Sequence, residues 1–252
     1  MITKNQLKYY SSLLNKKDRQ EEKKFLVEGS KLLREALDSG YECEIILALK
    51  DFVDENNDFT KSIGKQKLNI ELIKTIEFEK LCDTKNPQGV IGIFHFKQQT
   101  ITDIKNENLI VAMENISDPG NMGTILRNCD WFGVKNVLLS SNCAEIYNPK
   151  VIRASAGSVF HLNIFNEESF YNALEGQKKL GYKILCADLN GENLYNFTQH
   201  EKMILVLANE ANGPTNKLLE ICDVRITIPR IGKAESLNVA GASAVILAEL
   251  SK

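Results

Sequence analysis

Residues 228–239 read IPRIGKAESLNV and lead directly into a stretch of small apolar residues, 240–250, that predicts a helix. A polar loop rich in proline and glycine, between a strand and a helix, is where an α/β sheet builds its site. Two similar loops lie earlier in the chain, 115–123 (NISDPGNMG) and 208–215 (ANEANGPT). The sequence therefore predicts that three strand–loop–helix units of the second half contribute to one site.

Apolar runs and amphipathic segments alternate around these loops. We expect strands at 109–113, 134–140, 159–165, 182–189, 204–207 and 224–228, and helices at 122–132, 148–158, 167–180, 216–222 and 240–250. Alternation of this kind predicts an α/β fold with a mainly parallel sheet and helices on both faces.

The first 98 residues predict a smaller α/β domain. We expect strands at 25–27, 44–49, 69–73 and 90–96, and helices at 4–15, 30–40 and 75–82. Residues 99–108 are polar and read as a linker, so the predicted domains are 1–98 and 109–252.

The net charge of −2 argues against a chain that is basic throughout, although residues 1–34 hold nine Lys/Arg against four Asp/Glu. That local excess suits RNA phosphates, or is a solvated helix face.

The six cysteines form no Cys-x-x-Cys pair and read as reduced core residues. The three histidines lack metal-ligand spacing, so we expect no metal. No apolar run approaches the ~20 residues of a membrane helix, and the N-terminus is too polar for a signal peptide. We therefore expect a cytoplasmic protein without a membrane partner.

The three loops resemble, in order, the motifs of the SpoU-type (TrmH-like) RNA 2'-O-ribose methyltransferases. The matching residues are Asn121-Met122-Gly123 with Arg127, then Asn209-Glu210, then Ser236-Leu237-Asn238. The resemblance covers about residues 109–252. It implies S-adenosylmethionine as cofactor, a trefoil-knotted fold, a homodimer and a structured RNA substrate, with ribosomal RNA ahead of transfer RNA. More weakly, residues 1–98 resemble the L30e-like substrate-binding domain fused to such enzymes.

The resemblance also implies roles for individual residues. The catalytic set would be Arg127, Asn121, Glu210, Ser236 and Asn238, and the cofactor-binding set Ala208, Asn209, Gly213, Ile228 and Leu237. Arginine is a poor base because of its very high pKa, so we expect Arg127 to hold a phosphate and stabilise the forming alkoxide. The structural alternatives are an exposed arginine, a helix-terminus charge at Glu210 and helix capping by Ser236 and Asn238.

A further segment, 148–158 (NPKVIRASAGS), resembles one that family members carry beside the site. It implies RNA contacts for Lys150, Arg153 and Ser155. Lys150 and Arg153 would share one helical face and could clamp a phosphate, or form an ordinary solvated basic pair.

The chain departs from the family at Ala208 and Ala211, where glycine is usual. If either needs a positive φ, we expect strain of roughly 1 kcal/mol and weaker cofactor binding. This departure motivates a rival, a non-catalytic RNA-binding or ribosome-assembly protein, while a transfer RNA methyltransferase is a second alternative. A nicotinamide-dependent Rossmann enzyme is disfavoured because no Gly-x-Gly-x-x-Gly follows a strand. On the two-domain division, a chain of residues 105–252 should fold and bind S-adenosylmethionine.

Overall fold

The computed structural model describes residues 2–65, 68–97, 99, 104, 107–209 and 212–252. Its contacts divide the chain into two compact units. The first unit contains Met1–Gln98 and Tyr147–Phe160, and the second contains Gln99–Ile146 and His161–Lys252.

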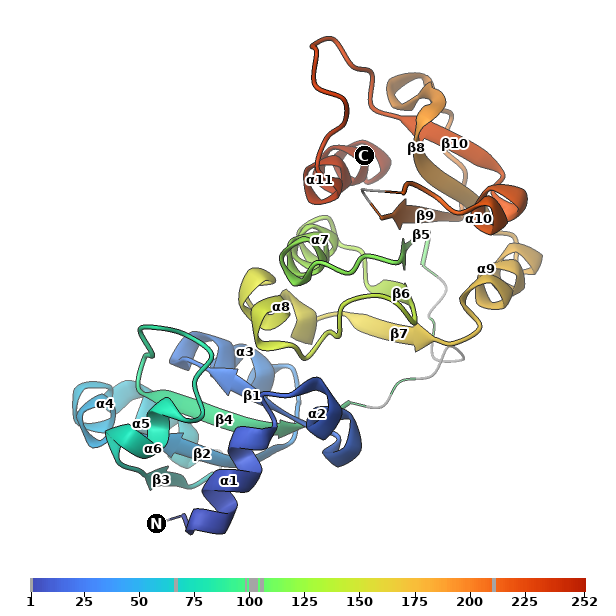
Figure 1. Cartoon of the computed structure of the whole chain (residues 1–252). Helices are drawn as coiled ribbons and strands as arrows, with labels where there is room; N and C mark the ends of the chain where they lie inside the picture. The colour runs from blue at the N-terminus through green and yellow to red at the C-terminus, as the bar shows by residue number, and fades with distance from the viewer. Residues whose placement is uncertain (1, 66–67, 98, 100–103, 105–106, 210–211) are drawn as a thin grey trace. The chain divides into compact units, whose positions relative to one another are not determined.

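A six-stranded sheet in the order β10-β8-β9-β5-β6-β7 forms the centre of the second unit (Figure 1). Every neighbouring pair in it is parallel. The strands are β5 (Leu109–Glu114), β6 (Asn136–Ser140), β7 (Asn163–Glu167), β8 (Lys183–Asn193), β9 (Met203–Ala208) and β10 (Val224–Thr227). The α/β prediction with a mainly parallel sheet is confirmed, and because all six strands are parallel their carboxyl ends meet at one edge.

Helices cover both faces of this sheet (Figure 1). On one face α7 (Pro119–Trp131) packs against α11 (Val239–Leu250). On the other, α9 (Phe170–Lys179) and α10 (Asn216–Ile221) pack on a cluster that includes alternate residues of β5 and β9. Successive strand residues point to opposite faces, so the continuous apolar run of β5 supplies side chains to both layers.

The first unit is built on a four-stranded sheet in the order β1-β4-β2-β3, which is antiparallel except between β2 and β3. Its strands are β1 (Lys24–Glu28), β2 (Cys43–Ala48), β3 (Ile70–Leu72) and β4 (Val90–His95). Its helices before residue 98 are α1 (Lys4–Ser12), α2 (Lys16–Glu22), α3 (Ser30–Asp38), α4 (Lys50–Glu55), α5 (Asn57–Lys65) and α6 (Thr75–Glu79). The sequence did not predict α2, α4 and α5, which are short and rich in charged or polar residues.

Residues 147–160 complete the first unit, although we expected them in the second domain. They hold α8 (Pro149–Ala154) and a 3₁₀ turn (Ser158–Phe160), so β7 begins at Asn163 and not at residue 159 as predicted. The ring of Tyr147 stacks on Phe25 of β1 with centroids 4.2 Å apart, and Phe160 lies on the same ring at 6.2 Å. Both are buried, so a segment distant in sequence closes the aromatic core of this unit.

Candidate active site

The site begins at the N-terminus of α7, just beyond β5. The side chain of Asp118 accepts a hydrogen bond from the backbone amide of Asn121 at 2.8 Å, and Pro119 occupies the first helical turn. Both features favour helix initiation at this point, because an acidic cap pairs with orphan amides and proline has no amide to lose. Asp118 therefore caps α7 and fixes where the helix begins after β5.

Asn121 and Asn238, two predicted catalytic residues, lie together in the fold although they are 117 residues apart. The Nδ2 of Asn238 donates to the Oδ1 of Asn121 at 3.1 Å. The Oδ1 of Asn238 accepts from the amides of Ala240 and Gly241 and so caps α11. Capping and a place in the site are therefore compatible, and the N-termini of α7 and α11 meet at this pair.

Arg127 and Ser236 are exposed, Arg127 in the second half of α7 and Ser236 in the loop before α11. Among the described residues, Arg127 has no hydrogen-bond or ion-pair partner, so the structure does not tie it to Asn121, Ser236 or Asn238. The neighbour of Arg127, Asn128, donates to the carbonyl of Ala240 at 3.0 Å and to the Ser243 hydroxyl at 2.9 Å. These bonds fix α7 against α11 and leave the Arg127 guanidinium available to an incoming group.

A cavity of about 370 Å³ opens beside these helix ends. All five residues predicted to bind the cofactor line it: Ala208, Asn209, Gly213, Ile228 and Leu237. Ser236 lines it as well. Two of the three loops identified in the sequence, 208–215 and 228–239, therefore line one cavity. The volume of this cavity falls within the ~300–1,000 Å³ typical of small-molecule sites.

The backbone angles of the described residues test the strain expected at Ala208 and Ala211. Ala208 ends β9 and is not among the described non-glycine residues with positive φ, so the expectation of strain does not apply to it. Glu210 and Ala211 lie outside the described residues. Gly213 does adopt a positive φ of 63°, as a turn that returns toward α10 requires.

Asn209, which the sequence predicted as a site residue, and Glu114, which it did not, hold the loop after β9. The Nδ2 of Asn209 donates to the carbonyl of Asn115 at 3.0 Å, joining the loops after β9 and β5. The buried carboxylate of Glu114 accepts from the Thr215 amide at 3.0 Å and from the Thr215 hydroxyl at 2.6 Å. It also accepts from the Tyr171 hydroxyl at 2.7 Å. Glu114 could have been found in the sequence, because it is a charged residue at the end of an otherwise apolar strand.

Comparison with known proteins agrees with this geometry. The model of the SpoU rRNA Methylase family matches residues 108–248. The chain belongs to the SpoU rRNA methylase family. The model of the MRM3-like substrate binding domain matches residues 4–92. The family predicted from the three motifs is therefore confirmed, and a substrate-binding domain model matches the part of the chain that we compared with L30e-like domains.

Several relatives span nearly the whole chain. A 23S rRNA (guanosine(2553)-2'-O)-methyltransferase of Bacillus subtilis is 32% identical, with 98% of this chain and 96% of the relative covered. A putative RNA methyltransferase of the TrmH family from Porphyromonas gingivalis has a structure with a TM-score of 0.88 at 29% identity, covering 99% of this chain and 98% of that one. The structure of an AdoMet-bound rRNA methyltransferase from Sinorhizobium meliloti has a TM-score of 0.85 at 27% identity, covering 99% of this chain and 95% of that one.

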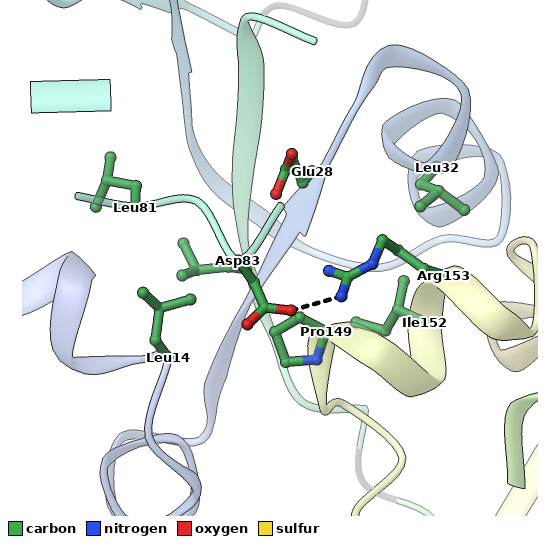
Figure 2. A pocket seen from close by; sticks show the side chains of 9 residues that line it. Leu14, Glu28, Leu32, Leu81, Asp83, Pro149, Ile152 and Arg153 are labelled. Carbon is green, nitrogen blue, oxygen red and sulfur yellow. Dashed lines mark hydrogen bonds and ion pairs between the residues drawn. The ribbon is translucent and has the colours of Figure 1, made fainter. Parts of the chain in front are cut away.

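The residues expected to contact RNA lie in the first unit of this SpoU family member and differ in their surroundings. Arg153 is held by Asp83, its Nη2 lying 2.5 Å from the carboxylate (Figure 2). Lys150 is exposed. Figure 2 shows the Arg153 guanidinium directed at Asp83 beside Glu28. Ser155 is fully buried and its hydroxyl donates to the carbonyl of Ile152 at 2.9 Å. We therefore assign Ser155 to the packing of α8 and retain Lys150 as the candidate for a phosphate.

The cysteines are free thiols, and one differs from the others. The side-chain hydrogen bond from Cys186 lowers the pKa of Cys222 below its ordinary value. The same hydrogen bond, together with burial, raises the pKa of Cys186. Burial raises the pKa of Cys43 and Cys82 to about 12. Cys222 is therefore the thiol with most thiolate character of these four.

Proposed function

We propose that this SpoU family member transfers a methyl group from S-adenosylmethionine to a ribose 2'-hydroxyl of structured RNA, and that the RNA is ribosomal. The observation that carries the proposal is the meeting of the α7 and α11 N-termini, through Asn121 and Asn238, beside a cavity lined by every predicted cofactor residue. Methyl transfer depends on holding the methyl donor and the acceptor hydroxyl in line, and polar side chains fixed at one edge of a parallel sheet can hold both.

The cavity fits the methyl donor in size and in lining. Leu207, Ile226 and Ile228 offer apolar surface to an adenine ring, and Ala208 and Gly213 present backbone groups without bulky side chains. When bound, S-adenosylmethionine supplies a methyl carbon activated by a sulfonium. The chain itself then has to position the acceptor and stabilise its charge.

Arg127 is the residue that we assign to the acceptor. A guanidinium binds a phosphate through two parallel hydrogen bonds and remains charged at all working pH values. Held this way beside the 2'-hydroxyl, it stabilises the negative charge that forms as the hydroxyl loses its proton. Asn121, Ser236 and Asn238 orient the acceptor, and Glu210 completes this set.

The finer parts of the proposal follow from the family. We assign residues 1–98 to RNA recognition, supported by the match to a substrate-binding domain model and by the basic excess of residues 1–34. Lys150 adds a phosphate contact. The proposed enzyme is a homodimer with a trefoil-knotted second unit, and it acts on its RNA in the cytoplasm. No helix among the described residues is long and apolar enough to cross a membrane.

The test is methyl transfer in vitro. Purified full-length protein with radiolabelled S-adenosylmethionine should label ribosomal RNA stripped of its own methyl groups, at a 2'-hydroxyl identified by resistance of the adjacent bond to alkali. Labelling of transfer RNA alone would favour the transfer RNA alternative. Cofactor binding or RNA binding without labelling of either RNA would favour the non-catalytic alternative.

A further inference from the structure

Strand β8 loops out where it borders the cavity. Arg225 of β10 pairs with Cys186, whereas the next residue, Ile226, pairs with Glu192, so residues 187–191 are inserted between two consecutive pairs. Of these, Ala187, Asp188, Leu189 and Asn190 line the cavity. Irregularities of this kind are over-represented beside active sites, where they redirect side chains.

Gly191 makes the return to the sheet possible. A Cβ at this position would lie 2.6 Å from backbone atoms of Arg225 and Ile226, a separation that side chains do not tolerate. Only glycine therefore lets the loop close so tightly on β10. The loop is consequently a built feature of the cavity wall.

Asp188 is the acidic side chain among the described residues that line the cavity, and its side chain is only 11% exposed. The Oδ1 atom accepts from the Asn190 amide at 3.1 Å, and the Oδ2 atom lies 3.4 Å from the Nη1 of Arg225. These contacts orient the carboxylate. A carboxylate has about four lone-pair sites, so two remain for a ligand.

We propose that the Asp188 carboxylate accepts hydrogen bonds from the 2'- and 3'-hydroxyls of the cofactor's ribose, an inference that rests on the function proposed above. Two adjacent hydroxyls are donors that match the two oxygens of one carboxylate. Arg225 already balances the charge of Asp188, which favours a neutral diol over the ammonium group of the methionine portion. An acidic residue near a strand end binds ribose hydroxyls in the same way in dinucleotide folds.

The test compares ligands that differ only at the ribose. Calorimetry would measure the binding of S-adenosylhomocysteine and of its 2',3'-dideoxy form to the wild type and to Asp188→Ala. The wild type should prefer the parent ligand by about tenfold or more, because the dideoxy form loses two hydrogen bonds to a charged group. Asp188→Ala should bind the two ligands within about threefold of each other, since nothing remains to distinguish them.

Controls separate ligand recognition from folding. Asp188→Asn keeps the size of the side chain and the oxygen that accepts from the Asn190 amide, so it should show an intermediate preference. Its melting temperature should fall only slightly, because the contact that it loses is the 3.4 Å one with the half-exposed Arg225. Asp223→Asn alters an acid directly before β10 that accepts from the Ile184 amide at 2.9 Å and lies outside the cavity lining, and it should keep the full preference.

Two results would overturn the proposal. One is an Asp188→Ala protein that still prefers the parent ligand as the wild type does. The other concerns an analogue of S-adenosylhomocysteine that lacks the α-amino group. If Asp188→Ala binds S-adenosylhomocysteine more weakly than the wild type does but binds this analogue equally well, Asp188 contacts the ammonium and not the ribose. If the wild type binds no S-adenosylhomocysteine at all, the proposed methyltransferase function itself is wrong. That outcome differs from the two above, in which the ligand binds but Asp188 does not recognise its ribose.

Discussion

Arg127 stands exposed on α7 with no hydrogen-bond or ion-pair partner among the described residues, while the adjacent Asn128 fixes the helix to α11. Its removal should therefore cost little stability. Arg127→Ala should leave the dissociation constant for S-adenosylmethionine within about threefold, yet lower turnover by roughly a hundredfold or more, the scale of one preorganised electrostatic contact. Single-turnover methylation of RNA together with calorimetry measures both quantities.

Arg127→Lys is the matched control, because it keeps the charge and removes the paired donor geometry. We expect turnover between the wild type and the alanine variant. Near-normal turnover in a folded Arg127→Ala protein would contradict the assignment of this residue to the acceptor.

Cys222 offers a second test at the residue scale. The hydrogen bond from Cys186 lowers the pKa of Cys222, so a larger thiolate fraction exists at a given pH than in a free cysteine. Its alkylation by iodoacetamide should rise with pH and level off at a lower pH than that of free cysteine. Cys186→Ala should move the plateau to higher pH. Mass spectrometry that finds Cys82 modified before Cys222 would show this assignment to be wrong.

At the scale of the elements, the end of β5 controls the loop after β9. The buried Glu114 carboxylate binds the amide and hydroxyl of Thr215, which caps α10. Glu114→Gln replaces one acceptor oxygen by a donor that faces other donors. We expect the unfolding free energy to fall by about 1–3 kcal/mol and cofactor binding to weaken severalfold, because residues 208, 209, 212, 213 and 214 line the cavity.

Glu107→Gln provides the comparison for Glu114→Gln. Glu107 precedes the same strand and pairs with the exposed Lys135 at 3.2 Å. Its substitution should change stability by at most about 1 kcal/mol, as for other exposed ion pairs, and leave cofactor affinity unchanged. Equal effects of the two substitutions in urea denaturation and calorimetry would remove the special role of Glu114.

The sequence predicted the elements whose signals are local. Glycine, proline and capping residues mark the ends of α7 and α11, and apolar runs mark the parallel strands, so these were placed within a few residues. The loop in β8 was not predicted because it depends on the register with β10, which pairs Ile226 with Glu192. Asp188 was missed for the same reason, since only that register turns it toward the cavity.

At the scale of the whole molecule, the boundary between the units is not a single point in the sequence. Residues 147–160 follow two strands of the second unit yet belong by their contacts to the first. No local signal distinguishes such a segment, because its apolar residues suit either core equally well. A chain cut at residue 105 would expose the buried Tyr147 and Phe160, so we no longer expect it to be a sound test of cofactor binding.

Tyr147→Ala in the full chain tests this organisation directly. The ring is 4% exposed and stacks on Phe25 of β1, so its removal should destabilise the first unit by about 3 kcal/mol or more. Hydrogen exchange should then accelerate in β1 and β4, more than 50 residues away in sequence, and stay unchanged in β5 and β9. Tyr195→Ala, at a ring that is 56% exposed, should alter neither set. Faster exchange in β5 or β6 alone would mean that residues 147–160 stabilise the second unit, and would restore the simple division at the linker.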